Sequence, residues 1–310
     1  MTLRTAALSS GWASSPATGR SSTTEAFLVG VDVGGTKIHA AAHDPARDTL
    51  ADARRPTDRA GREAVLAQVV DVVAELSGSR RPDAVVVGLP GIVHPVHHTL
   101  SEAPNLPDWD GIDAAATLSD ALGRPVRVEN DVNLAAWGEH AWCGESDLAF
   151  IAVGTGIGMA QVVGGRLLRG PDGSAGEVHD LPTGPPRVDL ESVVSGPALA
   201  KAYRTRTGTA ATPAQVLAAT ATDPEAAAAV DHLVAALADL VLTVHRLTAP
   251  AVIVLGGGLG STEAITGAVD RRLDLLTRRR PRVRASYLGS HAATFGALDL
   301  GRIDIDAGVS

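Results

Sequence analysis

The sequence is poor in cysteine, in aromatic residues and in long apolar runs, and each shortage excludes a class of protein. With Cys143 as the single cysteine among 310 residues, no disulfide framework forms within one chain, which favours a reducing cytoplasm. Aromatic residues make up 3% of the chain and the net charge is −8, so the basic run 278–280 does not predict a nucleic-acid surface. No apolar stretch approaches the roughly 20 residues that span a bilayer, so we expect no membrane segment.

The remaining composition is typical of a globular enzyme with two compact lobes. Hydrophobic residues make up 45% of the chain, which is long enough for two apolar cores. Residues 1–25 are rich in Ser, Thr, Ala and Gly and contain no apolar run of a secretory signal. We therefore predict a disordered N-terminal arm over 1–25, too short for a helix-turn-helix domain.

The hydrophobic pattern alternates between strands and helices in both halves of the chain. In the first half it predicts strands at 26–33, 37–43, 49–55 and 84–89 and a helix at 61–76. In the second half it predicts strands at 147–153, 156–163, 166–169, 251–255 and 283–288 and helices at 193–203, 224–247, 263–276 and from 292. This order predicts an α/β protein with partly parallel sheets, whose ligands lie in a crevice between the lobes.

A glycine turn directly follows an acid in the first predicted strand. Asp32 is followed by Gly34, Gly35, Thr36 and Lys37, and glycines let backbone amides approach a phosphate group. An ordinary hairpin with a type I′ turn is the alternative interpretation. Asp32 favours the phosphate site, because burying a polar group without a partner costs about 2–7 kcal/mol. We expect a hydrated Mg²⁺ to be that partner.

Two more glycine clusters follow predicted strands in the second half. They consist of Gly154, Thr155 and Gly156 after the strand at 147–153, and of Gly256, Gly257 and Gly258 after the strand at 251–255. Neither cluster has the GxGxxG pattern of a dinucleotide-binding turn, and the chain lacks the P-loop pattern GxxxxGKS or GxxxxGKT. The three turns together predict two phosphate hairpins and a nucleotide-binding ledge.

Asn130 and Asp131 directly precede the helix-like stretch VNLAAWGEHAW. Asn and Asp are favoured at helix N-caps, so capping is one interpretation of the pair. Catalysis is the other, because phosphoryl transfer uses a carboxylate to accept the proton of the acceptor hydroxyl group. Both can hold, since a helix N-terminus keeps a carboxylate such as Asp131 ionised.

Several short motifs occur in the order and rough spacing of the ROK family of sugar kinases, which the chain resembles from about 26 to 300. They are DVGGTK, GLPGIV, APNLPDW, ENDVNLAAWGE, GTGIG, AGE, LESVVSG, VLGGG and HAATFGALDL. The resemblance implies the actin-like ATPase (ribonuclease H-like) fold, with two lobes and a cleft between them, and a homodimer. The N-terminal lobe would comprise 26–130 and the C-terminal helix 291–305, and the C-terminal lobe would comprise 131–290.

The resemblance also assigns roles to the predicted site residues. It makes Asp131 the general base, a role worth roughly 10²- to 10⁴-fold in rate. It assigns the sugar contacts to Gly91, Asn105, Asn130, Glu177, His179 and Glu191. It places ATP at Asp32, Gly34, Gly35, Thr36, Lys37, Gly154, Thr155, Gly156, Gly256, Gly257 and Gly258. Mg²⁺ would be held by Asp32 through water. Trp109 would either line the sugar pocket or pack in the core.

The stretch 177–191 departs from the family pattern. Members often carry Glu-x-Gly-His followed by CxCGxxGC, whose histidine and cysteines hold a structural zinc. Here 177–191 contains no cysteine, so we expect no zinc site. His179 follows Glu177 by two residues instead of three, so either His179 or Asp180 takes the histidine position. The loop would instead be stiffened by Pro182, Pro185 and Pro186.

The leading hypothesis is an ATP-dependent hexose kinase, with glucose as the first acceptor to test. N-acetylglucosamine, N-acetylmannosamine, kanosamine, mannose and fructose are alternative acceptors, and polyphosphate is an alternative donor. Two other classes stay open. One is a sugar-sensing binding protein, because some members of the family are transcriptional repressors, and the other is an actin-like ATPase without a sugar acceptor.

Overall fold

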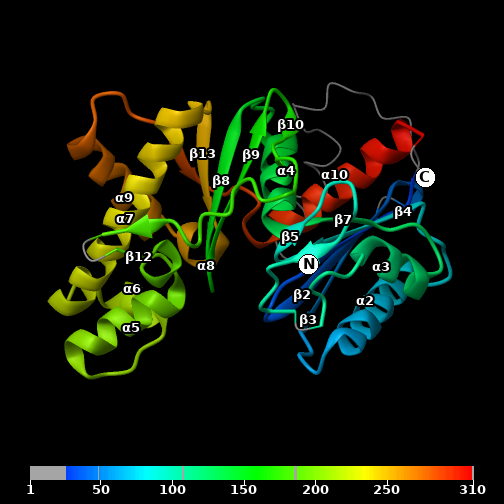
Figure 1. The fold of residues 1–310 in the computed structure, drawn as a ribbon, viewed down its shortest axis with the longest axis horizontal. Helices are drawn as coiled ribbons and strands as arrows, with labels where there is room; N and C mark the ends of the chain where they lie inside the picture. The colour runs from blue at the N-terminus through cyan, green and yellow to red at the C-terminus, as the bar shows by residue number, and fades with distance from the viewer. Residues whose placement is uncertain (1–25, 48, 107, 185–186, 309–310) are drawn as a thin grey trace. The chain divides into compact units, whose positions relative to one another are not determined.

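The computed structural model describes residues 26–47, 49–106, 108–184 and 187–308. The predicted arm at 1–25 and the prolines at 185 and 186 lie outside these residues. Contacts divide the chain into two compact units (Figure 1). Of the described residues, unit 1 comprises those up to Glu145, the segment Arg169–Ala175 and those from His291 on. Unit 2 comprises Ser146–Leu168 and Gly176–Ser290.

Unit 1 is built on a mixed sheet whose strands lie in the order β3-β2-β1-β4-β7. The strands are β1 (Leu28–Val33), β2 (Lys37–Asp44), β3 (Thr49–Pro56), β4 (Ala84–Leu89) and β7 (Arg127–Asn130). β1, β2 and β3 are antiparallel neighbours, whereas β4 and β7 continue the sheet in parallel with β1. The β-branched run 85–87 is buried throughout, as expected of a central strand covered on both faces.

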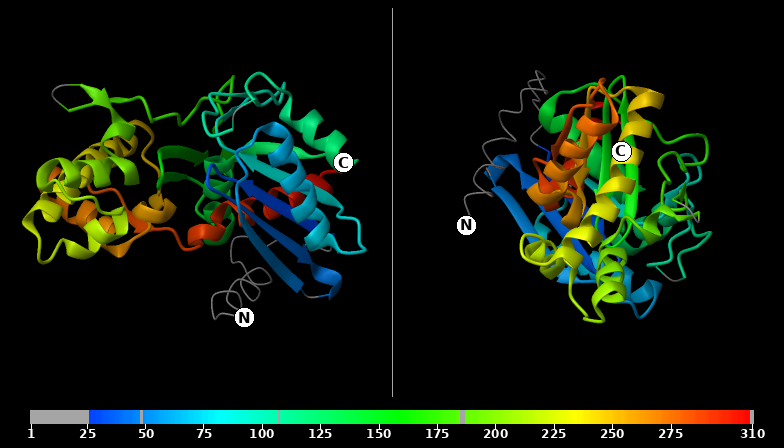
Figure 2. Two further views of the ribbon diagram at one scale, coloured as in Figure 1. Left: turned by 90° about the horizontal axis from the view of Figure 1, so that it is seen from below. Right: turned by 90° about the vertical axis from the view of Figure 1, so that its left-hand side faces the viewer.

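Helices cover both faces of this sheet (Figure 2). α10 (Ala292–Asp306) lies on one face, and α2 (Arg62–Ser77) with α3 (Ala114–Leu122) lies on the other. α4 (Asp131–Cys143) packs along α10, and a short hairpin of β5 (Ile92–Val93) and β6 (Leu100–Ser101) follows β4. Gly30 allows α10 to approach β1, because an added Cβ would lie 2.8 Å from the Cβ of Ala297.

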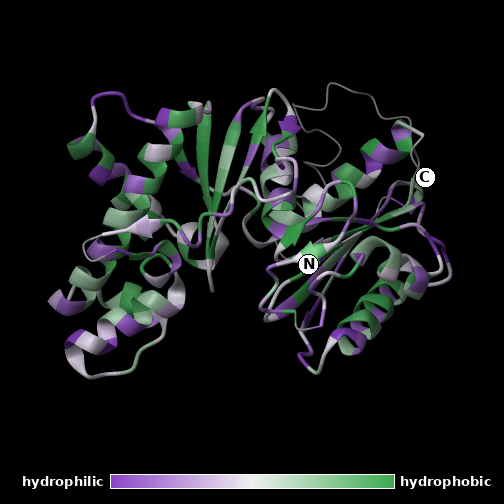
Figure 3. Ribbon diagram, in the orientation of Figure 1, coloured by the Kyte–Doolittle hydropathy of each residue, from purple (hydrophilic) through white to green (hydrophobic). Residues whose placement is uncertain are grey.

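Unit 2 repeats the sheet of unit 1, with the strands in the order β10-β9-β8-β13-β14. The strands are β8 (Leu148–Val153), β9 (Ile157–Val163), β10 (Arg166–Leu167), β13 (Val252–Gly256) and β14 (Val283–Ala285). β8, β9 and β10 are antiparallel neighbours, and β13 and β14 run parallel to β8. Figure 3 shows that β8 and β13 are hydrophobic along most of their length, and most of their residues are buried. The repeated architecture predicted from the sequence is confirmed.

The helices of unit 2 share an apolar core with one face of this sheet, the face that holds Ile151 and Ile253. They are α5 (Gly196–Thr207), α6 (Pro213–Ala219), α7 (Pro224–Thr248), α8 (Gly257–Gly260) and α9 (Glu263–Leu276). By length and composition alone, α7 would also be able to cross a membrane, so the expectation that no stretch approaches a membrane span was too strict. Most of its apolar stretch is buried in the core of unit 2, where Leu237 and Val241 are 0% exposed. α7 is thus a core helix of this unit.

Most predicted elements lie close to their expected bounds. The elements that were not predicted are α3, β7, α6, α8 and the two-residue strands β5, β6, β11 (Pro182–Thr183) and β12 (Val188–Asp189). All of them are short, and short segments carry little periodicity. The predicted lobe boundary at residue 130 also differs from the division into units, because α4 belongs to unit 1. α4 and α10 pack so closely that an added Cβ at Gly138 would overlap the carbonyl group of Ala292.

Candidate active site

The first glycine turn joins β1 to β2 and has an acid at its base. Asp32 is half-buried, whereas Thr36 and Lys37 are exposed. Gly34 donates its N–H to the carbonyl oxygen of Lys37 at 2.9 Å. Neither Gly34 nor Gly35 has a positive φ. The turn is therefore not of type I′, which needs a positive φ at both central residues.

Two side chains hold the carbonyl groups of this turn, and a third packs against it. Thr57 Oγ1 donates to the Gly34 carbonyl at 2.6 Å, and Arg59 Nε donates to the Gly35 carbonyl at 2.7 Å. An added Cβ at Gly35 would lie 2.8 Å from both Cβ and Cγ of Asn105. Glycine is needed at position 35 because Asn105 approaches it. The fold thus brings a predicted sugar contact beside the predicted phosphate turn.

The Asp32 carboxyl group is held in a poorly solvated position. Burial raises its pKa to about 6, and the positive charge of Lys37 opposes this shift. A difference of this size corresponds to about 3 kcal/mol for keeping the group ionised at neutral pH. The protein itself offers little positive charge to this carboxylate. A bound cation is therefore a suitable partner for Asp32.

Replacing Asp32 with asparagine is expected to stabilise the metal-free and nucleotide-free protein at pH 7 by up to about 3 kcal/mol. The folded pKa of about 6 lies above the ordinary value of 3.8, so the cost of ionisation is full above about pH 6 and vanishes as the pH falls towards 4. Urea unfolding of both proteins at neutral and acidic pH measures the difference. An equal gain in stability at both pH values would contradict this interpretation.

The N-terminus of α4 forms the second part of the candidate site in unit 1. Asn130 is the N-cap, and its Oδ1 accepts the N–H of Asn133 at 2.9 Å. Its Nδ2 donates to the carbonyl oxygen of Gly91 at 3.0 Å. Asp131 is the first residue of the helix, and its Oδ1 accepts the N–H of Val132 at 2.8 Å. Asn130 therefore caps α4, while Asp131 lies where the helix dipole favours an ionised carboxylate.

The strand register brings Asp32 and Asp131 to the same edge of the sheet. Asp32 in β1 pairs with Gly88 in β4, and Gly88 pairs with Glu129 in β7. Asp131 follows directly after the end of β7, and its Cα would lie 3.6 Å from a Cβ added at Gly88. The carboxyl ends of parallel strands are where open α/β sheets bind ligands.

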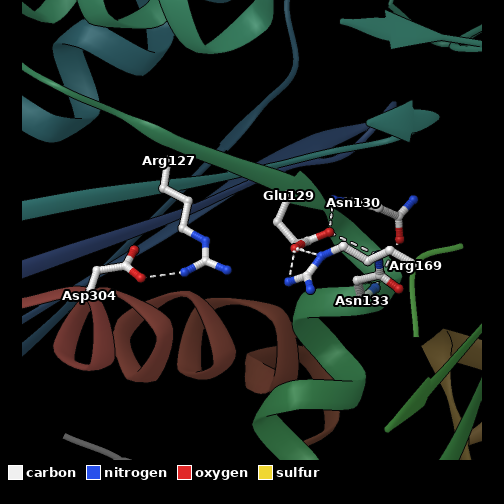
Figure 4. A network of polar contacts seen from close by, with 6 residues as sticks. All are labelled: Arg127, Glu129, Asn130, Asn133, Arg169 and Asp304. Carbon is white, nitrogen blue, oxygen red and sulfur yellow. Dashed lines mark hydrogen bonds and ion pairs between the residues drawn. The ribbon is translucent and has the colours of Figure 1, made fainter. Parts of the chain in front are cut away.

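Glu129 is the centre of a polar network directly before Asn130 and Asp131 (Figure 4). The residue is 3% exposed, and its Oε2 accepts hydrogen bonds from Arg169 Nε at 2.7 Å and Nη2 at 2.5 Å. Its Oε1 accepts the N–H of Asn130 at 3.1 Å and Nδ2 of Asn133 at 2.9 Å. The sequence analysis missed Glu129, Asn133 and Arg169 as members of the site. The position of Glu129 directly before Asn130 and Asp131 was a signal in the sequence that it belongs to the site. Nothing in the sequence near Arg169 indicated such a role.

In unit 2, the glycine turn after β8 lies beside the one after β13. A Cβ added at Gly154 would be 3.8 Å from the nitrogen of Gly258. Gly256 and Gly257 pack against β8, since an added Cβ would overlap the ring of Phe150 or the strand backbone. At Gly258 no atom lies within 4 Å of the added Cβ. Gly258 is therefore the glycine of its cluster that leaves room for a ligand.

The stretch 177–191 brings its three predicted sugar contacts together. Glu177 Oε2 lies 3.2 Å from His179 Nδ1, and Glu191 donates its N–H to the His179 carbonyl at 2.9 Å. Asp180 is exposed. The carboxyl group of Glu191 reaches the turn after β8, where its Oε2 accepts the N–H of Ile157 at 3.1 Å. One oxygen of Glu191 thus contacts the predicted phosphate turn.

Three side chains outside 177–191 converge closely enough to hold a metal ion. His39, Asp52 and His291 in unit 1 place their ligand atoms within 4.8 Å of one another. Arg54 Nη2 donates to His291 Nε2 at 2.9 Å, while His291 Nδ1 lies 3.5 Å from the Asp52 oxygen that His39 also contacts. A metal ion on His291 Nδ1 would put a proton on Nε2, facing the guanidinium group. We therefore interpret the cluster as a hydrogen-bonded ion network.

Two sheets of the same order and direction, both with glycine turns at strand ends, define the actin-like ATPase fold of the ROK sugar kinases. The ROK family model matches residues 28–302, and the chain belongs to this family.

Trp109 is 0% exposed in the core of unit 1, which confirms the packing interpretation of this residue.

Named relatives include kinases for two different sugars. The chain is 34% identical to the glucokinase of Streptomyces coelicolor over 154 residues, which are 49% of this chain and 48% of that protein. In this match the chain spans about half the length of its relative. It is 30% identical to the N-acetyl-D-glucosamine kinase of Citrobacter koseri over 297 residues, which are 86% of this chain and 97% of that protein.

A solved structure with a similar fold is the ROK family glucokinase from Streptomyces griseus, which was crystallised in complex with glucose and AMPPNP. The TM-score is 0.77 at 28% sequence identity, and the match covers 89% of this chain and 99% of that chain.

Proposed function

We propose that the chain is an ATP-dependent sugar kinase, which transfers the γ-phosphoryl group of ATP to a hydroxyl group of a free hexose with Asp131 as the general base. The position of Asp131 carries this proposal. It is the first residue of α4 and lies at the sheet edge that also holds Asp32 and the β1–β2 turn. Membership in the ROK family and the named kinases among its relatives support the same class.

Phosphoryl transfer depends more on the positioning of the reacting groups than on covalent chemistry by the protein. The sugar hydroxyl oxygen forms a bond to the γ-phosphorus, the bond from this phosphorus to the bridging oxygen of ADP breaks, and the hydroxyl proton passes to Asp131. Asn130 would orient the sugar, because its side chain is fixed by the Gly91 carbonyl and by the first turn of α4. Asn105 would add a contact beside the phosphate turn.

For the nucleotide, unit 1 would offer backbone N–H groups of the turn at 34–37 to phosphate oxygens, and unit 2 would offer those of the turn at 154–156, beside which Gly258 leaves room. Mg²⁺ fits Asp32, because burial raises the pKa of this carboxyl group and the positive charge of Lys37 opposes the shift only in part. When bound, Mg²⁺ would neutralise charge on the phosphate groups. Glu177, His179 and Glu191 would accept hydrogen bonds from the sugar hydroxyls, and they form the part of the proposal that decides the sugar.

The test is the release of ADP by the purified protein with ATP and Mg²⁺ across glucose, mannose, fructose, kanosamine, N-acetylglucosamine and N-acetylmannosamine. We expect turnover with glucose well above a control without sugar. Turnover with one amino sugar alone would reassign the acceptor but keep the kinase. Equal ADP release with and without sugar would favour an actin-like ATPase. No ADP release with any sugar of the panel would overturn the proposal.

The donor, the assembly and the location belong to the same proposal. A parallel series with polyphosphate in place of ATP tests the donor, and we expect ATP to be preferred. The family resemblance supports a homodimer and a cytoplasmic enzyme. Light scattering on the purified protein measures the assembly, and a monomer at micromolar concentration would contradict the dimer.

A further inference from the structure

We infer that Arg169 is a positioning residue for the kinase reaction, which holds Asn130 and Asp131 in place through Glu129. The inference rests on the proposed role of Asp131 as the general base. Arg169 itself is assigned no contact with the substrates, and its effect is transmitted by the carboxyl group of Glu129 (Figure 4).

Glu129 needs Arg169 because its carboxyl group is almost fully removed from water. The side chain of Glu129 is 4% exposed, and that of Arg169 is 26% exposed. A buried carboxylate that loses its cation either takes up a proton or moves towards solvent. Arg169 sends two N–H groups to one carboxylate oxygen, and such charge-assisted bonds fix orientation as well as charge.

The other oxygen of Glu129 connects this pair to the reacting end of α4. Oε1 accepts the backbone N–H of Asn130 and the side-chain amide of Asn133, so one carboxyl group joins the last residue of β7 to the first turn of the helix. Asp131 lies between these two anchored residues. A shift of Glu129 would therefore displace the base and the sugar-orienting amide together.

Arg169 is itself anchored within unit 1. It begins the segment Arg169–Ala175, whose ends are joined by a hydrogen bond from the Ala175 N–H to the Arg169 carbonyl at 3.1 Å. In the same segment, Gly173 packs so closely on β5 that an added Cβ would overlap the carbonyl of Val93. The guanidinium group is thus presented to Glu129 by a loop that is fixed at its ends and at its middle.

A second arginine, Arg127, lines the same cavity as Arg169 and provides a matched control. Arg127 in β7 donates to Asp304 in α10 at 2.5 Å (Figure 4). This pair lines the same cavity, of about 610 Å³, as Glu129 and Arg169. Arg127 pairs with Asp304 in α10, whereas Arg169 pairs with Glu129 in β7, so the two arginines differ in what they anchor.

The first experiment compares Arg169→Met with Arg127→Met in steady-state kinetics. We expect Arg169→Met to lower kcat by about 10- to 100-fold, because small displacements of a catalytic group carry penalties of this order. The KM values for sugar and ATP should change much less than kcat. Arg127→Met should keep kcat within about twofold of the wild type. Equal kcat values for the two variants would overturn the inference.

The cavity allows a second experiment by chemical rescue. Free guanidinium ion at low, non-denaturing concentration should restore kcat of Arg169→Ala in a saturable manner, since the cavity that Arg169 lines has room for a small cation. The same ion should restore nothing in Arg169→Ala combined with Glu129→Gln, because the partner is gone. Equal recovery in both proteins, or recovery in Arg127→Ala instead, would contradict the role of Glu129.

Two milder variants keep the inference testable if Arg169→Met does not fold. Arg169→Lys retains the positive charge but not the planar guanidinium group that donates two N–H bonds. Its kcat should therefore lie between those of wild type and Arg169→Met. Glu129→Gln should also lower kcat, and its effect should not add to that of Arg169→Lys because the two residues act as a unit. Full additivity would overturn the inference.

Asp131→Ala, measured alongside, separates the proposed function from the role of Arg169. An active Asp131→Ala enzyme would overturn both the proposed function and this inference. An inactive Asp131→Ala enzyme with unaffected Arg169 variants would overturn the inference alone.

Discussion

Asp131→Ala is expected to lower kcat for sugar phosphorylation by about 10²- to 10⁴-fold, the usual contribution of a general base. The sugar should still bind, because Asn130 still caps α4 and still donates to the carbonyl group of Gly91. The fold should also persist, since the side chain of Asp131 is at the start of α4 and not in its core. Steady-state kinetics with the accepted sugar and calorimetric titration of the same sugar measure the two quantities separately.

A control for this substitution is Asp113→Ala, at the N-cap of α3 in the same unit. Asp113 Oδ1 accepts the N–H of Ala116 at 2.9 Å, so its loss removes a helix cap at a cost of about 1 kcal/mol. We expect Asp113→Ala to be somewhat less stable and fully active. If both variants lost activity to the same extent, the effect of Asp131→Ala would come from stability and not from catalysis.

Gly296→Val is expected to abolish stable folding of unit 1. α10 crosses α4 so closely that a Cβ at position 296 would overlap the carbonyl oxygen of Leu134. The backbone cannot yield there without separating the two helices, so even Gly296→Ala should lose about 1–3 kcal/mol. Denaturant unfolding followed by circular dichroism measures the loss.

Gly301→Ala in the same helix provides the matched control. A Cβ at position 301 would make ordinary contact, 3.4 Å from Cγ2 of Val86. Alanine is favoured over glycine within a helix by up to about 1 kcal/mol, so this substitution should be neutral or stabilising. A stable Gly296→Val protein, or equal losses at 296 and 301, would contradict the close crossing of α4 and α10.

Much of the fold could be predicted from the sequence, because the central strands β1, β4, β8 and β13 are apolar runs followed by glycine turns. The run 84–89 and the run 252–256 are buried along nearly their whole length, so their pattern depends on no distant partner. α3 and β7 could not be predicted in this way. β7 has only its middle residues buried, and the Arg127 and Asn130 at its ends take polar partners.

The candidate site was predictable where neighbours in the sequence carry the chemistry, as at Asn130 and Asp131. It was not predictable where the partner comes from a distant segment. Nothing around Arg169 indicates that its guanidinium group meets a glutamate in β7. Gly35 is a similar case, because the reason for glycine there is the approach of Asn105 and not the turn type.

The position of α10 late in the sequence also affects how the protein folds during its synthesis on the ribosome. Chains generally fold from the N-terminus as they emerge. The sheet of unit 1 emerges early, yet the helix that covers one of its faces is made only after all of unit 2. The apolar residues on that face, Leu28 and Ala41 among them, pack against Leu298 of α10 and so remain uncovered until α10 has been synthesised. The nascent chain therefore presents a ready target for chaperones during that interval, and a premature stop before residue 292 would damage the unit that was synthesised first.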